Sequence, residues 1–241
     1  MKKLNIAGVK IHCVDFSKTI LKIEDFIRLK KPHQVITINP EFVVTAQKDK
    51  EFKNILNSAD LALPDGIGVV LASKLLKGCV KERITGIDLI PEIVKLAQKK
   101  GFSIYFLGAE EDIAKKTVDI LLKQYPKLKI AGAEAGSPHD LDLVERIKRT
   151  KPDILFVAFG HPKQEKWIYK YKERLSIPVS IGVGGAFDFI SKKVPRAPLW
   201  IQKMGLEWLY RLIKEPKRWK RQLKLIMFIF LIFGQFIRSL D

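Results

Sequence analysis

Cysteine is scarce in this chain of 241 residues, which holds two, Cys13 and Cys79, and no CxxC pair. So few cysteines argue against a disulfide framework and against a zinc site. We therefore expect both to be ordinary thiols of a reducing compartment. The first residues carry lysines but lack a sustained apolar core and a small-residue cleavage site, so we expect no signal peptide and a cytoplasmic protein.

Two glycine signatures of nucleotide-binding proteins are also missing. The chain has neither a GxGxxG with an acidic residue downstream, which marks a dinucleotide fold, nor a GxxxxGK[ST] phosphate loop. The first absence counts against a dehydrogenase.

Acidic residues are outnumbered, with 26 Asp and Glu against 44 Lys and Arg, which gives a net charge of +18. A chain this basic is expected to meet an anionic partner: nucleic acid, nucleotide or an anionic membrane. Residues 192–241 hold twelve Lys and Arg against three Asp and Glu, so about half of the net charge lies there. That segment also holds an apolar run and no recognised nucleic-acid motif, which favours lipid over nucleic acid as its partner.

The first 195 residues alternate apolar runs with amphipathic segments, a pattern typical of an α/β protein. Residues 5–14 predict a small β-hairpin. Strands are predicted over residues 34–38, 61–64, 103–107, 129–133, 153–159 and 178–183, with helices between them. We expect a Rossmann-like, doubly wound, mostly parallel sheet as a core over residues 1–195, followed by a helical appendage over residues 196–241.

Polar or glycine residues follow four of the predicted strands, at Asn39, Asp65, Gly160 and residues 182–185. Ligands of open α/β sheets bind at the carboxyl ends of the strands, so Asp65 is a candidate site residue. The alternative is that Asp65 caps the helix that follows, since Asp is a preferred N-cap residue. Thr37 and Asn39 have the same two interpretations, as site residues or as cap and turn residues.

Turns from a strand through glycine into a helix offer backbone N–H groups to phosphate. We expect a nucleotide to be bound at this rim by residues from three turns and one carboxylate: Gly108, Ala109, Gly160, Pro162, Gly184, Gly185 and Asp188. Arg83 is either a site residue or a surface ion pair with Asp88. The acidic triplet at residues 140–142 resembles a metal-binding DxD, but it opens a helix, where acidic residues are favoured, so we expect capping and no metal.

The appendage combines basic and apolar segments. Residues 205–221 predict a basic amphipathic helix interrupted at Pro216, and residues 225–233 are apolar all round. That run is shorter than the ~20 residues that a spanning helix needs. We expect it in the membrane interface; packing on the core or in an oligomer interface are the alternatives.

Eight short motifs, in this order, resemble the WecG/TagA/CpsF family of bacterial glycosyltransferases over residues 6–221. They are TxNxE at 37–41, AQKDKEF at 46–52, LPDGIG at 63–68, RxxGxD at 83–88, GxPKQE at 160–165, GVGGAFD at 182–188, RAP at 196–198 and GLEWLYRLIKEPKR at 205–218.

The resemblance implies a UDP-sugar-dependent hexosyltransferase that inverts the anomeric centre without a metal or another cofactor. The sugar, commonly N-acetylmannosamine, would pass to undecaprenyl-diphosphate-linked N-acetylglucosamine in wall teichoic acid or related polysaccharide synthesis. Another UDP-hexose, used for capsule or exopolysaccharide, is the alternative donor. The enzyme would be peripheral on the cytoplasmic face of the membrane and would bind no nucleic acid; a monomer and a homo-oligomer both stay open.

The resemblance also assigns roles to residues. The catalytic base falls on Asp65, and Thr37, Asn39, Arg83 and Gln164 match other active-site positions. Appendage arginines that reach the diphosphate match Arg211, Arg218 and Arg221. Of the competing carboxylates, we expect Asp88 to be structural and Asp188 to contact the ribose or the glycine turn.

Overall fold

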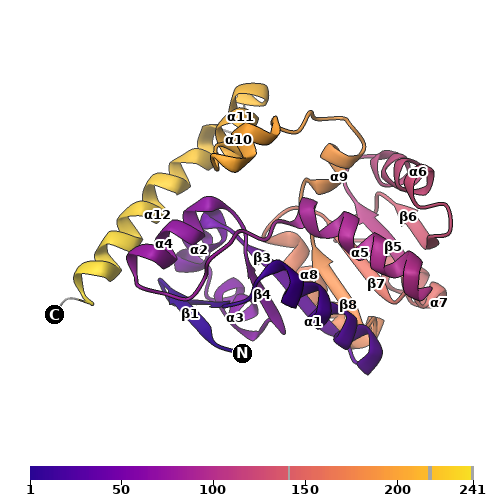
Figure 1. The fold of residues 1–241 in the computed structure, drawn as a ribbon. Coiled ribbons are helices and arrows are strands. Elements are labelled where there is room, and N and C mark those ends of the chain that lie inside the picture. Colours follow the sequence, from indigo (N-terminus) through magenta and orange to yellow (C-terminus); the bar gives the residue numbers. More distant parts are fainter. Residues whose placement is uncertain (141, 217–218, 240–241) are drawn as a thin grey trace.

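The computed structural model describes residues 1–140, 142–216 and 219–239 and shows an α/β fold (Figure 1). Within these residues, six parallel strands form one sheet in the order β4-β3-β8-β7-β5-β6, and β1 and β2 form a separate antiparallel hairpin. The predicted α/β class, the parallel sheet, the N-terminal hairpin and the helical C-terminus are confirmed.

Each strand predicted from the sequence is present. The strands are β1 (Lys3–Ile6), β2 (Val9–His12), β3 (His33–Ile38), β4 (Leu61–Pro64), β5 (Ser103–Gly108), β6 (Lys129–Glu134), β7 (Ile154–Ala158) and β8 (Val179–Gly182). The helices are α1 (Phe16–Leu29), α2 (Pro40–Lys48), α3 (Lys50–Ser58), α4 (Ile67–Leu75), α5 (Gly86–Lys100), α6 (Ile113–Gln124), α7 (Leu143–Thr150), α8 (Lys163–Leu175), α9 (Ala186–Ile190), α10 (Leu199–Lys203), α11 (Glu207–Lys214) and α12 (Trp219–Ile237).

The sheet is covered on both faces, as a doubly wound fold requires. Neighbouring residues of one strand, such as Val35 and Ile36, belong to different hydrophobic clusters because side chains alternate across a strand. One face packs against α1, α5, α6 and α9, and the other packs against α2, α3, α7 and α8. Burial on both faces explains why the strands read as continuous apolar runs in the sequence.

The apolar C-terminal run, residues 225–233, lies within α12, which runs beside α2 and α4 in Figure 1. Phe228 and Ile232 are buried in the cluster that α2, α3 and α4 share. Packing on the core, the alternative interpretation of this run, therefore holds for one face of α12. Among the described residues, no helix combines the length and apolar content that crossing a bilayer requires.

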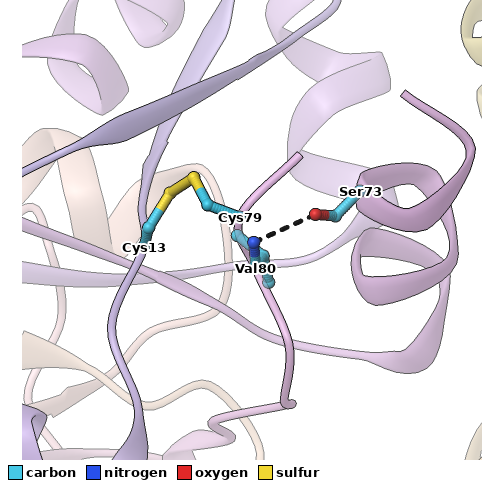
Figure 2. The surroundings of a disulfide bond; sticks show 4 residues. All are labelled: Cys13, Ser73, Cys79 and Val80. Carbon is cyan, nitrogen blue, oxygen red and sulfur yellow. Dashed lines mark hydrogen bonds between the residues drawn. A yellow bond between two sulfur atoms is a disulfide. The ribbon is translucent and has the colours of Figure 1, made fainter. Parts of the chain in front are cut away.

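The two cysteines are not free thiols, and the expectation from their scarcity was wrong. A disulfide joins Cys13, just after β2, to Cys79, in the loop after α4 (Figure 2). The two Cα atoms are 5.5 Å apart although 66 positions separate the residues in sequence. Hydrogen bonding of the Val80 N–H to Ser73 Oγ, at 3.0 Å, ties the same loop to α4. Cysteine usage therefore gives no argument for a reducing compartment.

The acidic triplet begins with Asp140, which accepts a hydrogen bond from the Asp142 backbone N–H at 3.0 Å and pairs with Arg146 at 2.7 Å. Asp142 is the N-cap residue of α7, but its side chain makes no capping bond. The capping role falls on Asp140, two residues earlier. Residue 141, between them, lies outside the described residues.

Candidate active site

Four strands that neighbour one another in the sheet, β4, β3, β8 and β7, end at one cavity of about 880 Å³. The residues that follow these strands line it, among them Asn39, Asp65, Gly160 and Gly184. The cavity thus lies at the carboxyl ends of the strands, where open α/β sheets bind ligands. Its volume is in the range of small-molecule sites.

Asp65 lies directly beyond β4. Its backbone N–H donates to the carbonyl oxygen of Ile38 at 2.8 Å, which extends the pairing of β4 with β3 by one residue. Gly66, at φ +89°, is the N-cap residue of α4, and no side chain caps that helix. The capping interpretation of Asp65 is therefore not what the structure shows, and the half-buried carboxyl group lines the cavity instead.

The surroundings of Asp65 favour its protonated form. Burial is the largest cause that raises its pKa to about 7; the positive charge of Arg83 opposes the shift, and the carboxylates of Glu207 and Asp88 add to it. A carboxylate that titrates near neutral pH is matched to accept a proton from a hydroxyl group.

Arg83 does not pair with Asp88, so the surface ion pair considered from the sequence is absent. Its guanidinium lies 3.3 Å from Glu207 on α11, and Glu207 also binds Arg196 at 2.9 Å. Arg196 in turn pairs with Asp88 at 2.7 Å, and Asp88 accepts a hydrogen bond from Thr85 Oγ1 at the start of α5. Asp88 thus holds structure together, as expected, and the chain of charges links the Arg83 loop to α11.

Thr37 and Asn39 both line the cavity at the end of β3. Asn39 also caps α2, because its Oδ1 accepts the N–H groups of Glu41 at 2.9 Å and Phe42 at 3.3 Å. The cap interpretation of Asn39 is correct, and the cap places its side chain at the cavity wall. Thr37, by contrast, makes no cap in the described chain.

Gln164 connects two loops of the site. Its Oε1 accepts the N–H of Gly160 and the N–H of Gly184, both at 3.1 Å, while its Nε2 donates to Glu165 at 2.6 Å. Burial raises the pKa of Glu165 to about 7, although the hydrogen bond from Gln164 acts to lower it. A Cβ on Gly182 would lie 2.6 Å from both side chains, so this strand position needs glycine. Gln164 is 2% exposed and braces the turns that surround the cavity.

The expected nucleotide-binding residues divide into two groups. Ala109, Gly160, Gly184, Gly185 and Asp188 line the cavity, whereas Gly108 and Pro162 are not among its lining residues. At Gly108, with φ +99°, a Cβ would lie 2.9 Å from the carbonyl carbon of Ala158, so glycine there allows β5 to approach β7.

Arg211 reaches the glycine turn after β8 from α11. A Cβ on Gly185 would come within 2.9 Å of its guanidinium, which lies 4.5 Å from the Phe189 ring centroid. The guanidinium pairs with Glu215 at 2.5 Å and lies 3.7 Å from Asp188. Burial raises the pKa of Asp188, and Lys193 and Arg211 oppose it.

Arg221, near the start of α12, forms a bidentate pair with Glu41 at the first turn of α2. Burial acts to raise the pKa of Glu41, but Arg221 outweighs it and holds that pKa below its usual range. Lys224 Nζ contacts Thr45 Oγ1 at 3.1 Å one turn further along. The third predicted arginine, Arg218, lies outside the described residues.

The model of the glycosyl transferase WecG/TagA/CpsF family matches residues 4–241, which is almost the whole chain. The chain belongs to this family. It is therefore a glycosyltransferase, as the motifs predicted.

Three relatives of this glycosyltransferase carry the same name, N-acetylglucosaminyldiphosphoundecaprenol N-acetyl-beta-D-mannosaminyltransferase. The Bacillus subtilis (strain 168) protein is 44% identical over 192 residues, which cover 79% of this chain and 75% of the relative. The Bacillus spizizenii (strain W23) protein is 37% identical over 196 residues, 81% of this chain and 76% of the relative. The Staphylococcus aureus (strain MW2) protein is 32% identical over 239 residues, 96% of this chain and 94% of the relative.

Three charged residues of this WecG/TagA/CpsF member received no role from the sequence: Glu41, Arg196 and Glu207. All three belong to motifs that carried the resemblance, at 37–41, 196–198 and 205–218. Their partners, Arg221, Asp88 and Arg83, come from distant parts of the chain. The signal was therefore present as motif membership, but the pairing needed the fold.

Proposed function

We propose that this glycosyltransferase transfers N-acetylmannosamine from UDP-N-acetylmannosamine to undecaprenyl-diphosphate-linked N-acetylglucosamine, with inversion, in wall teichoic acid or related polysaccharide synthesis. The names of the relatives supply the transferred sugar and the acceptor. The observation that carries the proposal is the placement of Asp65, a carboxyl group with a pKa of about 7, in a cavity that arginines and glycine turns surround.

The chemical step would be a single displacement. A hydroxyl oxygen of the acceptor sugar forms a bond with the anomeric carbon, from the side opposite UDP. Asp65 accepts the hydroxyl proton as that bond forms. The bond between the anomeric carbon and the diphosphate oxygen breaks, and UDP leaves with the electron pair. The low-dielectric surroundings of Asp65 make it a stronger base than an exposed aspartate.

The leaving diphosphate gains negative charge, and two kinds of group are available to stabilise it. The Gly184 turn contributes backbone dipoles, as turns and helix starts do at phosphate sites. Arg83 and Arg211 contribute guanidinium groups at the cavity wall, which bind phosphate oxygens in a bidentate way. Both arginines pair with carboxylates here, Glu207 and Glu215, which the diphosphate would replace as partners.

We also propose that the exposed side of α12 and the helices before it rest on an anionic membrane, where the lipid-linked acceptor resides. Exposed apolar side chains include Trp200, Trp219, Met227 and Phe230. Trp at an interface together with basic residues is typical of membrane-surface helices. The cytoplasmic face follows from the UDP-sugar donor, and self-association through the same apolar surface is the alternative.

The test of the transfer is a panel of UDP-sugars incubated with a short-chain N-acetylglucosaminyl-diphosphate lipid, with mass spectrometry of the product. We expect a disaccharide lipid from UDP-N-acetylmannosamine at the highest rate. If another UDP-hexose forms the product at a higher rate, that sugar nucleotide is the donor in place of UDP-N-acetylmannosamine. Absence of any disaccharide lipid with all donors would refute the proposal.

The test of the membrane surface is co-sedimentation of the protein with vesicles of anionic lipid, with vesicles of neutral lipid and, separately, with DNA. Phe230→Ser should weaken binding to anionic vesicles because a large exposed apolar side chain no longer enters the lipid. Leu21→Ser, an exposed leucine on α1, is the matched control and should leave binding unchanged. Equal binding to neutral and anionic vesicles, or stronger binding to DNA than to vesicles, would contradict the proposed membrane surface. A concentration-dependent dimer in analytical ultracentrifugation that Phe230→Ser abolishes would favour self-association.

A further inference from the structure

The cavity that holds Asp65 does not end at the polar rim of the sheet. It continues between α4 and α12, where its walls become apolar. α4 contributes Leu71 and Leu75, and α12 contributes Leu225, Ile229 and Phe233. The three α12 residues are four apart, so they form one stripe along the helix. We call this part of the cavity, lined by these five residues, the apolar arm.

The apolar arm begins close to the catalytic candidate. A Cβ on Gly68, three residues after Asp65, would lie 3.7 Å from Phe228 and 3.9 Å from Leu225, so α4 and α12 approach each other there. Phe228 and Ile232, which are buried, also line the cavity beside the stripe. Arg221 precedes the stripe on α12 and lines the same cavity. Along α12, the wall therefore passes from cationic to apolar.

A ligand that fills the whole cavity must match this order: a sugar at Asp65, anionic charge near the arginines, and a hydrocarbon chain between the two helices. We propose that the apolar arm binds the first isoprene units of the acceptor's prenyl chain, adjacent to its diphosphate. This inference rests on the proposed function, because it takes a prenyl-diphosphate-linked sugar as the acceptor.

The length of the stripe limits how much of the chain is held. From Leu225 to Phe233 the helix rises roughly 12 Å, at about 1.5 Å per residue. Each isoprene unit adds four in-line carbons with bonds near 1.5 Å, so about two to three units fit. Leu71 and Ile229 remain 54% and 48% exposed, which leaves the arm open along its side for the remaining chain to leave toward lipid.

The first experiment measures transfer by the full chain without vesicles or detergent, using acceptors with the same N-acetylglucosaminyl diphosphate and one to four isoprene units. We expect the KM for the acceptor to fall by at least about tenfold from one unit to three, since buried apolar area adds affinity, and then to level off. A KM that does not depend on chain length would overturn the inference while leaving the transfer itself established.

Variants of residues that line the apolar arm test whether the dependence on chain length arises there. Leu71→Ser and Ile229→Ser should each raise the KM for the three-unit acceptor by about fivefold and should raise the KM for the one-unit acceptor less, because a single unit fills only part of the arm. The matched control is Leu21→Ser, because Leu21 is a leucine on α1 with 62% exposure and lies away from the cavity. Equal increases for both acceptors, or no increase in either variant, would contradict the assignment.

A second measurement does not depend on turnover. A photoreactive diazirine on the third isoprene unit should label peptides that contain residues 67–75 and 225–233 of the wild-type protein. Excess unlabelled acceptor should suppress the labelling, and a short-chain phosphatidylglycerol should not. Labelling elsewhere, or suppression by the phospholipid, would show that the arm is not the prenyl site.

Discussion

Replacement of Asp65 by Asn tests the stability and the chemistry of the site in one variant. The carboxyl group has a pKa of about 7 in the folded chain, against about 3.9 for an exposed aspartate. Between about pH 4 and pH 7, Asp65 is therefore protonated in the folded state and ionised in the unfolded state. By linkage, the stability that the protonated carboxyl contributes is fully present below about pH 4 and is lost as the pH rises through about 7.

The size of the loss follows from the shift. About three pKa units at about 1.4 kcal/mol each give about 4 kcal/mol as an upper limit at pH 8. Because Asp65 is only half-buried and the cavity admits water, we expect about 2 to 4 kcal/mol. Asn has nearly the same shape and no charge, so Asp65→Asn should be more stable than the wild type by that amount at pH 8 and equal to it near pH 4.

The assay is thermal unfolding followed by circular dichroism at both pH values. For a chain of this length, the gain at pH 8 corresponds to a rise in Tm of roughly 4 to 16 °C. The matched control is Asp25→Asn on the exposed side of α1, which should leave Tm unchanged at both pH values. The same Asp65→Asn protein should lose at least about 100-fold in transfer rate, because it has no general base, while UDP binding in calorimetry is retained.

Two results would refute this reasoning separately. Equal Tm values for wild type and Asp65→Asn at pH 8 would show that the carboxylate is ionised without penalty and that its surroundings differ from those described. Retained turnover in Asp65→Asn would remove Asp65 as the base even if the stability result agreed.

Three further predictions follow from the contacts around the site. Glu207→Gln should move the rising limb of the pH–rate profile to lower pH, because Glu207 acts to raise the pKa of Asp65; an unmoved limb would contradict this coupling. Gln164→Met should lower the free energy of unfolding in urea by about 2 to 4 kcal/mol, since two loop N–H groups lose their acceptor. A loss below about 0.5 kcal/mol would show that Gln164 does not stabilise these loops. Reduction of the Cys13–Cys79 disulfide should cost up to about 4 kcal/mol for its 66-residue separation, measured as a lower urea midpoint, and an unchanged midpoint would argue against the bond.

The sheet was predictable from the sequence because its strands are buried on both faces and read as apolar runs. Asp65, Asn39, Gly160 and Gly184 were predictable as neighbours for the same reason: the ends of parallel strands meet at one edge. Thr37 and Arg83 were candidates with an alternative interpretation each, and Gln164 came from the family motifs; all three line the cavity.

Contacts between distant segments were not predictable. The disulfide joins residues that have no local signal of pairing, and the charge pair of Arg83 with Glu207 spans 124 positions. Residues 225–233 of α12 are apolar on all sides, so periodicity does not show which side of this run packs on the core. The structure shows that the side with Phe228 and Ile232 packs against α2, and the opposite side remains exposed.

The pH dependence of kcat/KM for the donor, measured on the full chain with a soluble short-prenyl acceptor, tests the central claim most directly. This ratio reports the ionisation of essential groups in the free enzyme. If Asp65 accepts the acceptor's proton, the logarithm of kcat/KM rises with unit slope at acidic pH and levels off near pH 7. A profile that stays flat from about pH 5.5 to 9 would contradict a base with the surroundings of Asp65.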